Sequence, residues 1–135
     1  ELMKHLAGNT LSRCRNFLTS DGEKPDRDRD GEFITTSVDT QEQLRKTLDE
    51  AWAVLLDEYG RLTAEDLDRT VYIRNEPHSV RQALLRQLTH HAGHVGQIVF
   101  LAKSFAGHRW RTLSIPRGQS KEFEKMMRSK HEAAH

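Results

Sequence analysis

Residues 80 to 105 carry the pattern that most constrains the fold of this chain, an apolar repeat with the period of a long helix. The repeat comprises Val80, Leu84, Leu88, His91, Val95, Ile98, Ala102 and Phe105. Because its members are three or four positions apart, they share one face of a helix of about seven turns. Ser79 and Gln82 form a capping box before it, and Gly107 follows its end. A long helix with an apolar face needs helical partners, so the repeat predicts a helical bundle.

Three further helices are predicted, separated by segments without helical periodicity. They are expected at residues 1–18, at residues 40–60 and from about Ser120 onward. Thr40 and Gln43 form the capping box of the second, and Gly60 ends it. Residues 19–33, rich in Asp, Gly and Arg, predict a loop, and residues 71–77 predict an extended connection. The predicted fold class is therefore all-α.

The composition excludes several classes of function. A chain of 135 residues suits one modest core, so we expect a single domain over residues 1–135. The 21 Lys and Arg residues nearly balance the 20 Asp and Glu residues, and the net charge is +1. The chain therefore lacks the excess of positive charge that is typical of nucleic-acid-binding proteins. No apolar run approaches the ~18 residues that a membrane span needs. The single cysteine, Cys14, forms no intrachain disulfide, so we expect a reducing, cytoplasmic setting.

Three histidines, His90, His91 and His94, fall within five residues of the longest predicted helix. His90 and His94 are one turn apart and can present two ring nitrogens to a single ion. His91 and His94, three positions apart, can do the same, and periodicity does not choose between the two pairs. Gln97, one turn beyond His94, is placed either to hydrogen-bond a ligand or to face solvent. Core histidines satisfied by hydrogen bonds alone are the alternative to a metal site.

Two imidazoles make an incomplete site, so a third ligand is expected elsewhere in the chain. His78 and His108 lie too far along the helix from the pair, and His131 and His135 lie in a polar tail. His5 remains, because it borders the apolar stripe of a separate helix. Three histidines leave coordination positions open for water or substrate, which is typical of catalytic rather than structural sites.

Two other patterns resemble functional sites but are interpreted as ordinary structure. Residues 26–31, "DRDRDG", match the first half of a calcium-binding EF-hand loop, but Ser37 stands where a bidentate Glu is required. Arg27 and Arg29 also cancel its charge, so we expect a solvated loop. Cys14 has no evident base beside it, and we interpret it as a bystander rather than a reactive thiol.

Several motifs, in order along the chain, resemble the DinB-like (damage-inducible, YfiT-like) superfamily of metalloenzymes. They are "KHLAGN", "TSDGEKP", "TVYIRNEPHSV", "HHAGHVGQIVFLAK" and "LSIPRGQS". The resemblance is to a subgroup of uncharacterised function and covers nearly all of the chain. It implies a four-helix bundle whose first helix is missing here, so that the domain is N-terminally incomplete. It also implies a metal site, commonly zinc or nickel, formed by His5, His90 and His94, and leaves His91 as a core or supporting residue.

The resemblance implies a function as well. Some members of the superfamily are thiol-dependent transferases or isomerases that use low-molecular-weight thiols. We therefore expect a homodimeric, metal-dependent enzyme of the thiol-transferase type, with the divalent ion as a Lewis acid and a thiol and a small molecule as substrates. No general base is identified, so the catalytic residues stay unassigned. A non-catalytic helical module that holds a structural ion, or none, is the alternative.

Overall fold

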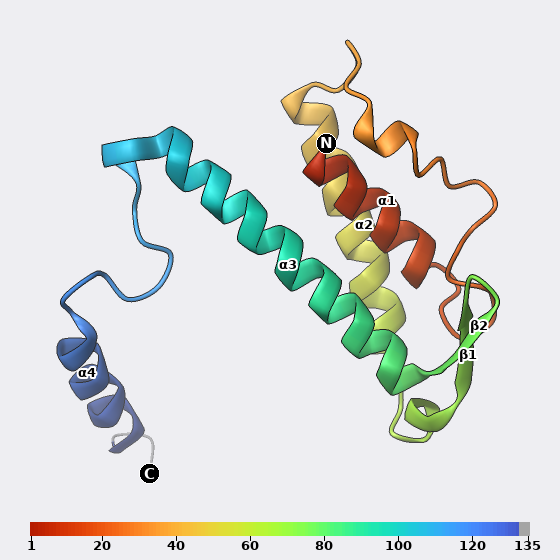
Figure 1. Ribbon diagram of the computed structural model, residues 1–135. Coiled ribbons are helices and arrows are strands. Elements are labelled where there is room, and N and C mark those ends of the chain that lie inside the picture. The colour runs from red at the N-terminus through yellow and green to blue at the C-terminus, as the bar shows by residue number, and fades with distance from the viewer. Residues whose placement is uncertain (133–135) are drawn as a thin grey trace. The chain divides into compact units, whose positions relative to one another are not determined.

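The computed structural model describes residues 1–132 and shows a mostly helical chain with one small antiparallel sheet (Figure 1). Its main elements are α1 (Leu2–Cys14), α2 (Gln41–Gly60), β1 (Thr70–Ile73), β2 (Glu76–Ser79), α3 (Val80–Ala106) and α4 (Ser120–Glu132). The chain forms two compact units, one over residues 1–99 and one that begins at Phe100. The expectation about His135 falls outside the described residues. The predicted helical character is confirmed, whereas a single domain stays a prediction.

Helices α1 and α2 pack side by side in the first unit (Figure 1). Each helix has buried apolar residues, such as Leu6 of α1 and Leu55 of α2. Helix α2 begins as predicted, because the Thr40 hydroxyl accepts a hydrogen bond from the backbone N–H of Gln43 at 3.2 Å. It also ends at the predicted Gly60.

The segment expected to be a plain extended connection is a β-hairpin, so the all-α prediction is incomplete. Strands β1 and β2 pair in register, with Thr70 opposite Ser79 at the open end of the hairpin. Arg74 and Asn75 form its two-residue turn with φ of 56° and 63°. Asp21, from the loop after α1, accepts hydrogen bonds from both turn N–H groups at 2.8 and 2.7 Å. This distant carboxylate supports a turn that lacks the usual Asn-Gly sequence.

The main hydrophobic cluster lies where the hairpin meets the start of α3. Its buried members are Phe17, Val71, Ile73, Val80 and Ala83. The capping box predicted before α3 is present: the Gln82 side chain accepts from the N–H of Ser79 at 2.8 Å, and the Ser79 hydroxyl accepts from the N–H of Gln82 at 3.2 Å. The cluster and the cap together fix the direction in which α3 leaves the hairpin.

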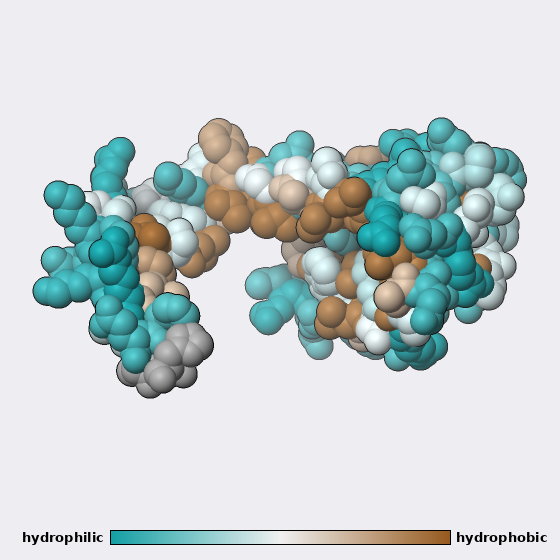
Figure 2. Space-filling model, turned by 90° about the horizontal axis from the view of Figure 1, so that it is seen from below, coloured by the Kyte–Doolittle hydropathy of each residue, from teal (hydrophilic) through white to brown (hydrophobic). Residues whose placement is uncertain are grey.

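The buried face of α3 differs from the face that the apolar repeat predicts. Its buried residues are Val80, Ala83, Gln87 and His91. By contrast, Leu88 is 65% and Val95 47% exposed, although both belong to the predicted repeat. A polar face of α3 is turned toward α1, because its Gln87, His90 and His91 side chains form hydrogen bonds there. Much of the apolar surface of α3 is therefore exposed, and Figure 2 shows it in brown. No helix in the described part of the chain is long and apolar enough to cross a membrane.

Candidate metal centre

Three histidines from two helices converge in the first unit. Helix α1 supplies His5, and α3 supplies His90 and His94, which lie one turn apart with their rings edge to face. Each offers one ring nitrogen that lies within 4.8 Å of the nitrogens of the other two. The Nε2 atoms of His5 and His90 are 3.1 Å apart. His5, His90 and His94, the three expected ligands, therefore lie close enough to hold a metal ion.

The distance between the Nε2 atoms of His5 and His90 is compatible with two ligands of one metal ion, as it is with a direct hydrogen bond. Zinc–nitrogen bonds of about 2.0–2.1 Å at tetrahedral or octahedral angles place two ligand nitrogens about 2.9–3.4 Å apart. The 3.1 Å between the Nε2 atoms of His5 and His90 falls in that range. The Nδ1 atom of His90 is buried and has no hydrogen-bond partner among the described residues. A buried nitrogen without a partner is uncommon. An ion held between the two Nε2 atoms would bind the opposite side of the His90 ring, so it would not account for this atom.

A carboxylate holds the His5 ring in place. The Nδ1 of His5 lies 2.8 Å from Oε2 of Glu32, so its N–H donates there and its Nε2 lone pair faces the other two histidines. Glu32 in turn accepts hydrogen bonds from Nε and NH2 of Arg27 at 2.8 and 2.9 Å. The side chains of Arg27 and Glu32 are only 4% and 8% exposed. The Phe33 ring stacks on His5 at a centroid distance of 5.0 Å. The ring orientation is thus fixed on two sides.

The two histidines of α3 have different surroundings. The Nδ1 of His94 lies 2.7 Å from Oε1 of Gln97, which is itself exposed, so Gln97 both contacts this histidine and faces solvent. This bond leaves the other ring nitrogen of His94 free to bind an ion. Burial, with smaller contributions from His94 and His5, lowers the pKa of His90 to about 4. His90 is therefore neutral at neutral pH, the form in which imidazole binds metals.

His91 points into a different hydrogen-bond network. Its Nε2 lies 2.9 Å from the Thr10 hydroxyl and 3.0 Å from Nε2 of Gln87, which donates to Asn9 at 3.0 Å. Its ring also lies 5.1 Å from that of Trp52. The alternative pair His91 and His94 is not brought together with His5, so the geometry favours His90 and His94. His91 is a core histidine that joins α3 to α1.

Sequence reasoning missed Arg27 and Glu32. Residues 26–31 were expected to form a solvated loop, and their aspartates are indeed exposed, but Arg27 turns inward to Glu32. The one signal available was chemical: a metal-bound histidine usually donates its second N–H to a carboxylate. Cys14, expected to be a bystander, is buried against the Tyr59 hydroxyl at 3.4 Å, and burial raises its pKa to about 11.

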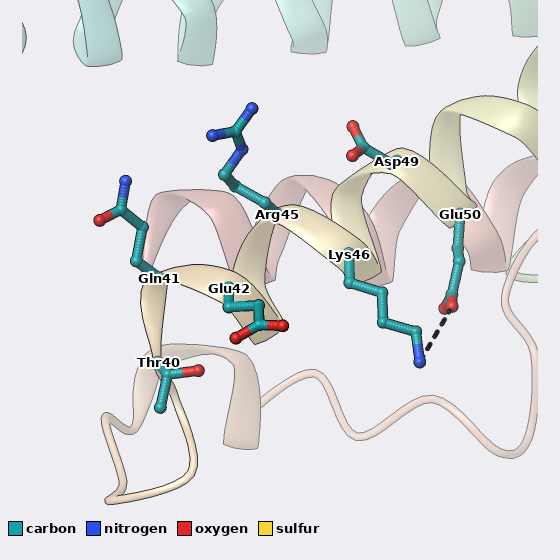
Figure 3. Close-up of a pocket in the computed structure, with 7 residues that line it drawn as sticks. All are labelled: Thr40, Gln41, Glu42, Arg45, Lys46, Asp49 and Glu50. Carbon is teal, nitrogen blue, oxygen red and sulfur yellow. Dashed lines mark ion pairs between the residues drawn. The ribbon is translucent and has the colours of Figure 1, made fainter.

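Two hollows on the first unit differ in their relation to the histidines. A hollow of about 930 Å³ runs along residues 40–50, where every lining side chain is exposed and Lys46 pairs with Glu50 (Figure 3). One helix lines it, and it includes none of the three histidines. A smaller cavity of about 200 Å³ has His5 and His90 in its wall. Of these two hollows, only the smaller one therefore borders the histidine cluster.

Comparisons with known proteins give one match. A family model described as "Protein of unknown function (DUF1572)" matches residues 1–119, which include all three histidines and both of the residues that orient His5. Searches of curated proteins and of solved structures gave no significant match.

Proposed function

The chain belongs to the DUF1572 family, whose description names no activity, and we propose from its site that it is a divalent-metal-binding protein. His5, His90 and His94 would hold the ion. The observation that carries this proposal is the convergence of their ring nitrogens within 4.8 Å, with one of the three rings fixed by a buried carboxylate. Three imidazole nitrogens and open coordination positions suit zinc or nickel.

The proposed activity is that of a metal-dependent enzyme of the thiol-transferase type. A bound divalent ion acts as a Lewis acid and lowers the pKa of a thiol or water beside it. The chain's own residues position the reactants. Glu32 fixes the His5 ring, Gln97 fixes the His94 ring, and the cavity beside His5 and His90 admits a small substrate. The transfer forms a carbon–sulfur bond, releases the leaving group with its electron pair, and passes the thiol proton to solvent.

The proposal extends to features that support it less directly. Membership of the DinB-like superfamily, with its four-helix bundle, rests on the motifs "KHLAGN" and "HHAGHVGQIVFLAK", which carry the three histidines. A low-molecular-weight thiol as co-substrate follows from the same resemblance. A cytoplasmic setting rests on the single, buried Cys14. A homodimer would cover exposed apolar side chains such as Leu88 and Val95.

The ligand set is tested by metal analysis of protein purified without an affinity tag. We expect close to one ion per chain, and loss of the ion in His90→Ala and in His94→Ala because two imidazoles hold it poorly. His91→Ala is the matched control. It removes a neighbouring, more deeply buried ring that binds Thr10 instead, so it should lower stability and keep the ion. Retention of the ion by the first two variants, or its loss from the control alone, would show that the ligand assignment is wrong.

A second experiment separates an enzyme from a non-catalytic module. The metal-loaded protein is assayed with small thiols and electrophilic acceptors, beside protein stripped of its ion. We expect a turnover that returns when zinc or nickel is restored and is lost in His94→Ala. Rates that never depend on the ion, from a protein that binds one, would favour a structural ion in a helical interaction module.

A further inference from the structure

The cavity beside the histidine cluster is unusually rich in arginine. Besides His5 and His90, its wall contains Arg13, Arg27, Arg29, Arg74 and Arg86. These five come from α1, the loop after it, the hairpin turn and α3. The whole chain has a net charge of only +1, so this concentration of guanidinium groups is local rather than a property of the surface at large.

Internal ion pairs neutralise only part of this charge. Glu23 hydrogen-bonds to Arg13, Arg27 and Arg74. Glu32 binds Arg27 and His5, as described above. Asp30, which is 96% exposed, lies 3.8 Å from Arg29. Five guanidinium groups thus face three carboxylates, which leaves a surplus of two positive charges at the mouth of the cluster.

The arginines divide into a buried pair and an exposed group. Arg13 and Arg27 are 8% and 4% exposed, and their hydrogen bonds are used within the protein. Arg29 and Arg74 are each about half exposed at 52% and 54%, and keep N–H groups free for a ligand. Arg86, on α3 one turn before His90, is exposed and forms no hydrogen bond or ion pair with the described residues. An unpaired guanidinium beside buried ones is a ready donor to a carboxylate or phosphate.

We propose that this cavity binds an anionic group, a carboxylate or a phosphate, of the substrate that reacts at the histidine cluster, with Arg86 as its main anchor. The inference rests on the proposed function and narrows its substrate class to small acids or phosphate esters. The volume of about 200 Å³ is that of about seven water molecules, so it holds one such group with a short carbon chain. His5 and His90 in the wall place the rest of the molecule beside the ion site.

The test is calorimetric titration of the metal-loaded protein with inorganic phosphate and, separately, with malonate. Arg86→Gln should weaken the preferred anion by about tenfold or more, since one charge-assisted hydrogen bond is lost. Arg81→Gln is the matched control: it removes the same charge from the same helix, but Arg81 pairs with Asp68 outside the cavity. The control should change the dissociation constant by less than about twofold. The preferred anion identifies the substrate group as a phosphate or a carboxylate.

The same titrations separate this proposal from the one it rests on. Arg86→Gln should keep its full metal content, whereas His94→Ala, whose altered residue does not line the cavity, should lose the ion and still bind the anion. The inference is overturned if neither anion binds the wild type, or if Arg86→Gln and Arg81→Gln weaken anion binding equally. It is also overturned if His94→Ala loses anion binding together with the ion while Arg86→Gln has no effect on anion binding. Failure of the proposed function would instead appear as a wild type that holds no metal, whatever the anion titrations give.

Discussion

Replacing Gly8 by Ala tests whether the Glu32 carboxylate orients the His5 ring. A Cβ at Gly8 would overlap Oε1 of Glu32 and lie 2.8 Å from its Cδ. The side chain of Glu32 cannot step aside freely, because Arg27 holds both of its oxygens and His5 holds one. The added methyl group must therefore displace the carboxylate and break these bonds. The variant perturbs His5 without changing any of the proposed ligands.

The size of the effect follows from two opposing contributions. Breaking a buried ion pair costs about 3–5 kcal/mol, and Arg27 and Glu32 are almost fully buried. Alanine favours an α-helix over glycine by about 1 kcal/mol, which offsets part of that cost. We expect a net destabilisation of about 2–4 kcal/mol. Loss of the carboxylate beside a metal-bound histidine should also weaken metal binding by about 10–100-fold.

Urea unfolding and competition with a chromophoric chelator measure these two quantities. Gly96→Ala is the control, because a Cβ there meets no atom within 4 Å and the position is also helical. That variant should be as stable as the wild type or slightly more so, with unchanged metal affinity. If Gly8→Ala behaves like Gly96→Ala in both measurements, Glu32 does not orient His5.

Two further outcomes concern the titratable groups of Cys14, which is buried, and Asp21, which is partly buried. Burial raises the pKa of Cys14 to about 11, so its thiol should be about one part in a thousand ionised at pH 8 and react with a disulfide reagent only after urea unfolds the protein. Burial opposes ionisation of Asp21, but three backbone N–H bonds outweigh it and lower its pKa below 3.8. Its contribution to stability is present above pH 3.8 and is lost as the pH falls through the lowered value. This contribution to the urea midpoint should therefore be constant above about pH 5 and fall as the pH is lowered below 3.8, and the fall should be smaller in Asp21→Asn.

The sequence was sufficient for the features that depend on helical periodicity. Spacing within one helix predicts the start of α3 at its Ser79 capping box, the contact of His90 with His94, and the end of α2 at Gly60. His5 was a candidate because it borders the apolar stripe of a separate helix that must pack against the rest of the protein. Its grouping with His90 and His94, rather than with His91 and His94, was expected only from the resemblance to the DinB-like superfamily.

The residues that support the site could not be found in this way. Arg27 and Glu32 lie in an irregular segment, where no period relates sequence to direction, and alternating charges there predict solvent exposure. The five arginines that line the cavity beside the histidine cluster come from four separate parts of the chain. The rotation of α3 was missed because apolar periodicity alone does not reveal that Gln87 and His91 have hydrogen-bond partners on α1.

The interface of α1 with α3 has a consequence for stability in the cell. Buried hydrogen bonds join these helices between Asn9 and Gln87 and between Thr10 and His91. The three histidines lie along the same interface. An ion held there would cross-link side chains 85 positions apart in sequence. Such a protein would gain about 2.7 kcal/mol of folding free energy when free metal exceeds its dissociation constant a hundredfold. Its resistance to proteolysis would then report on the supply of the ion.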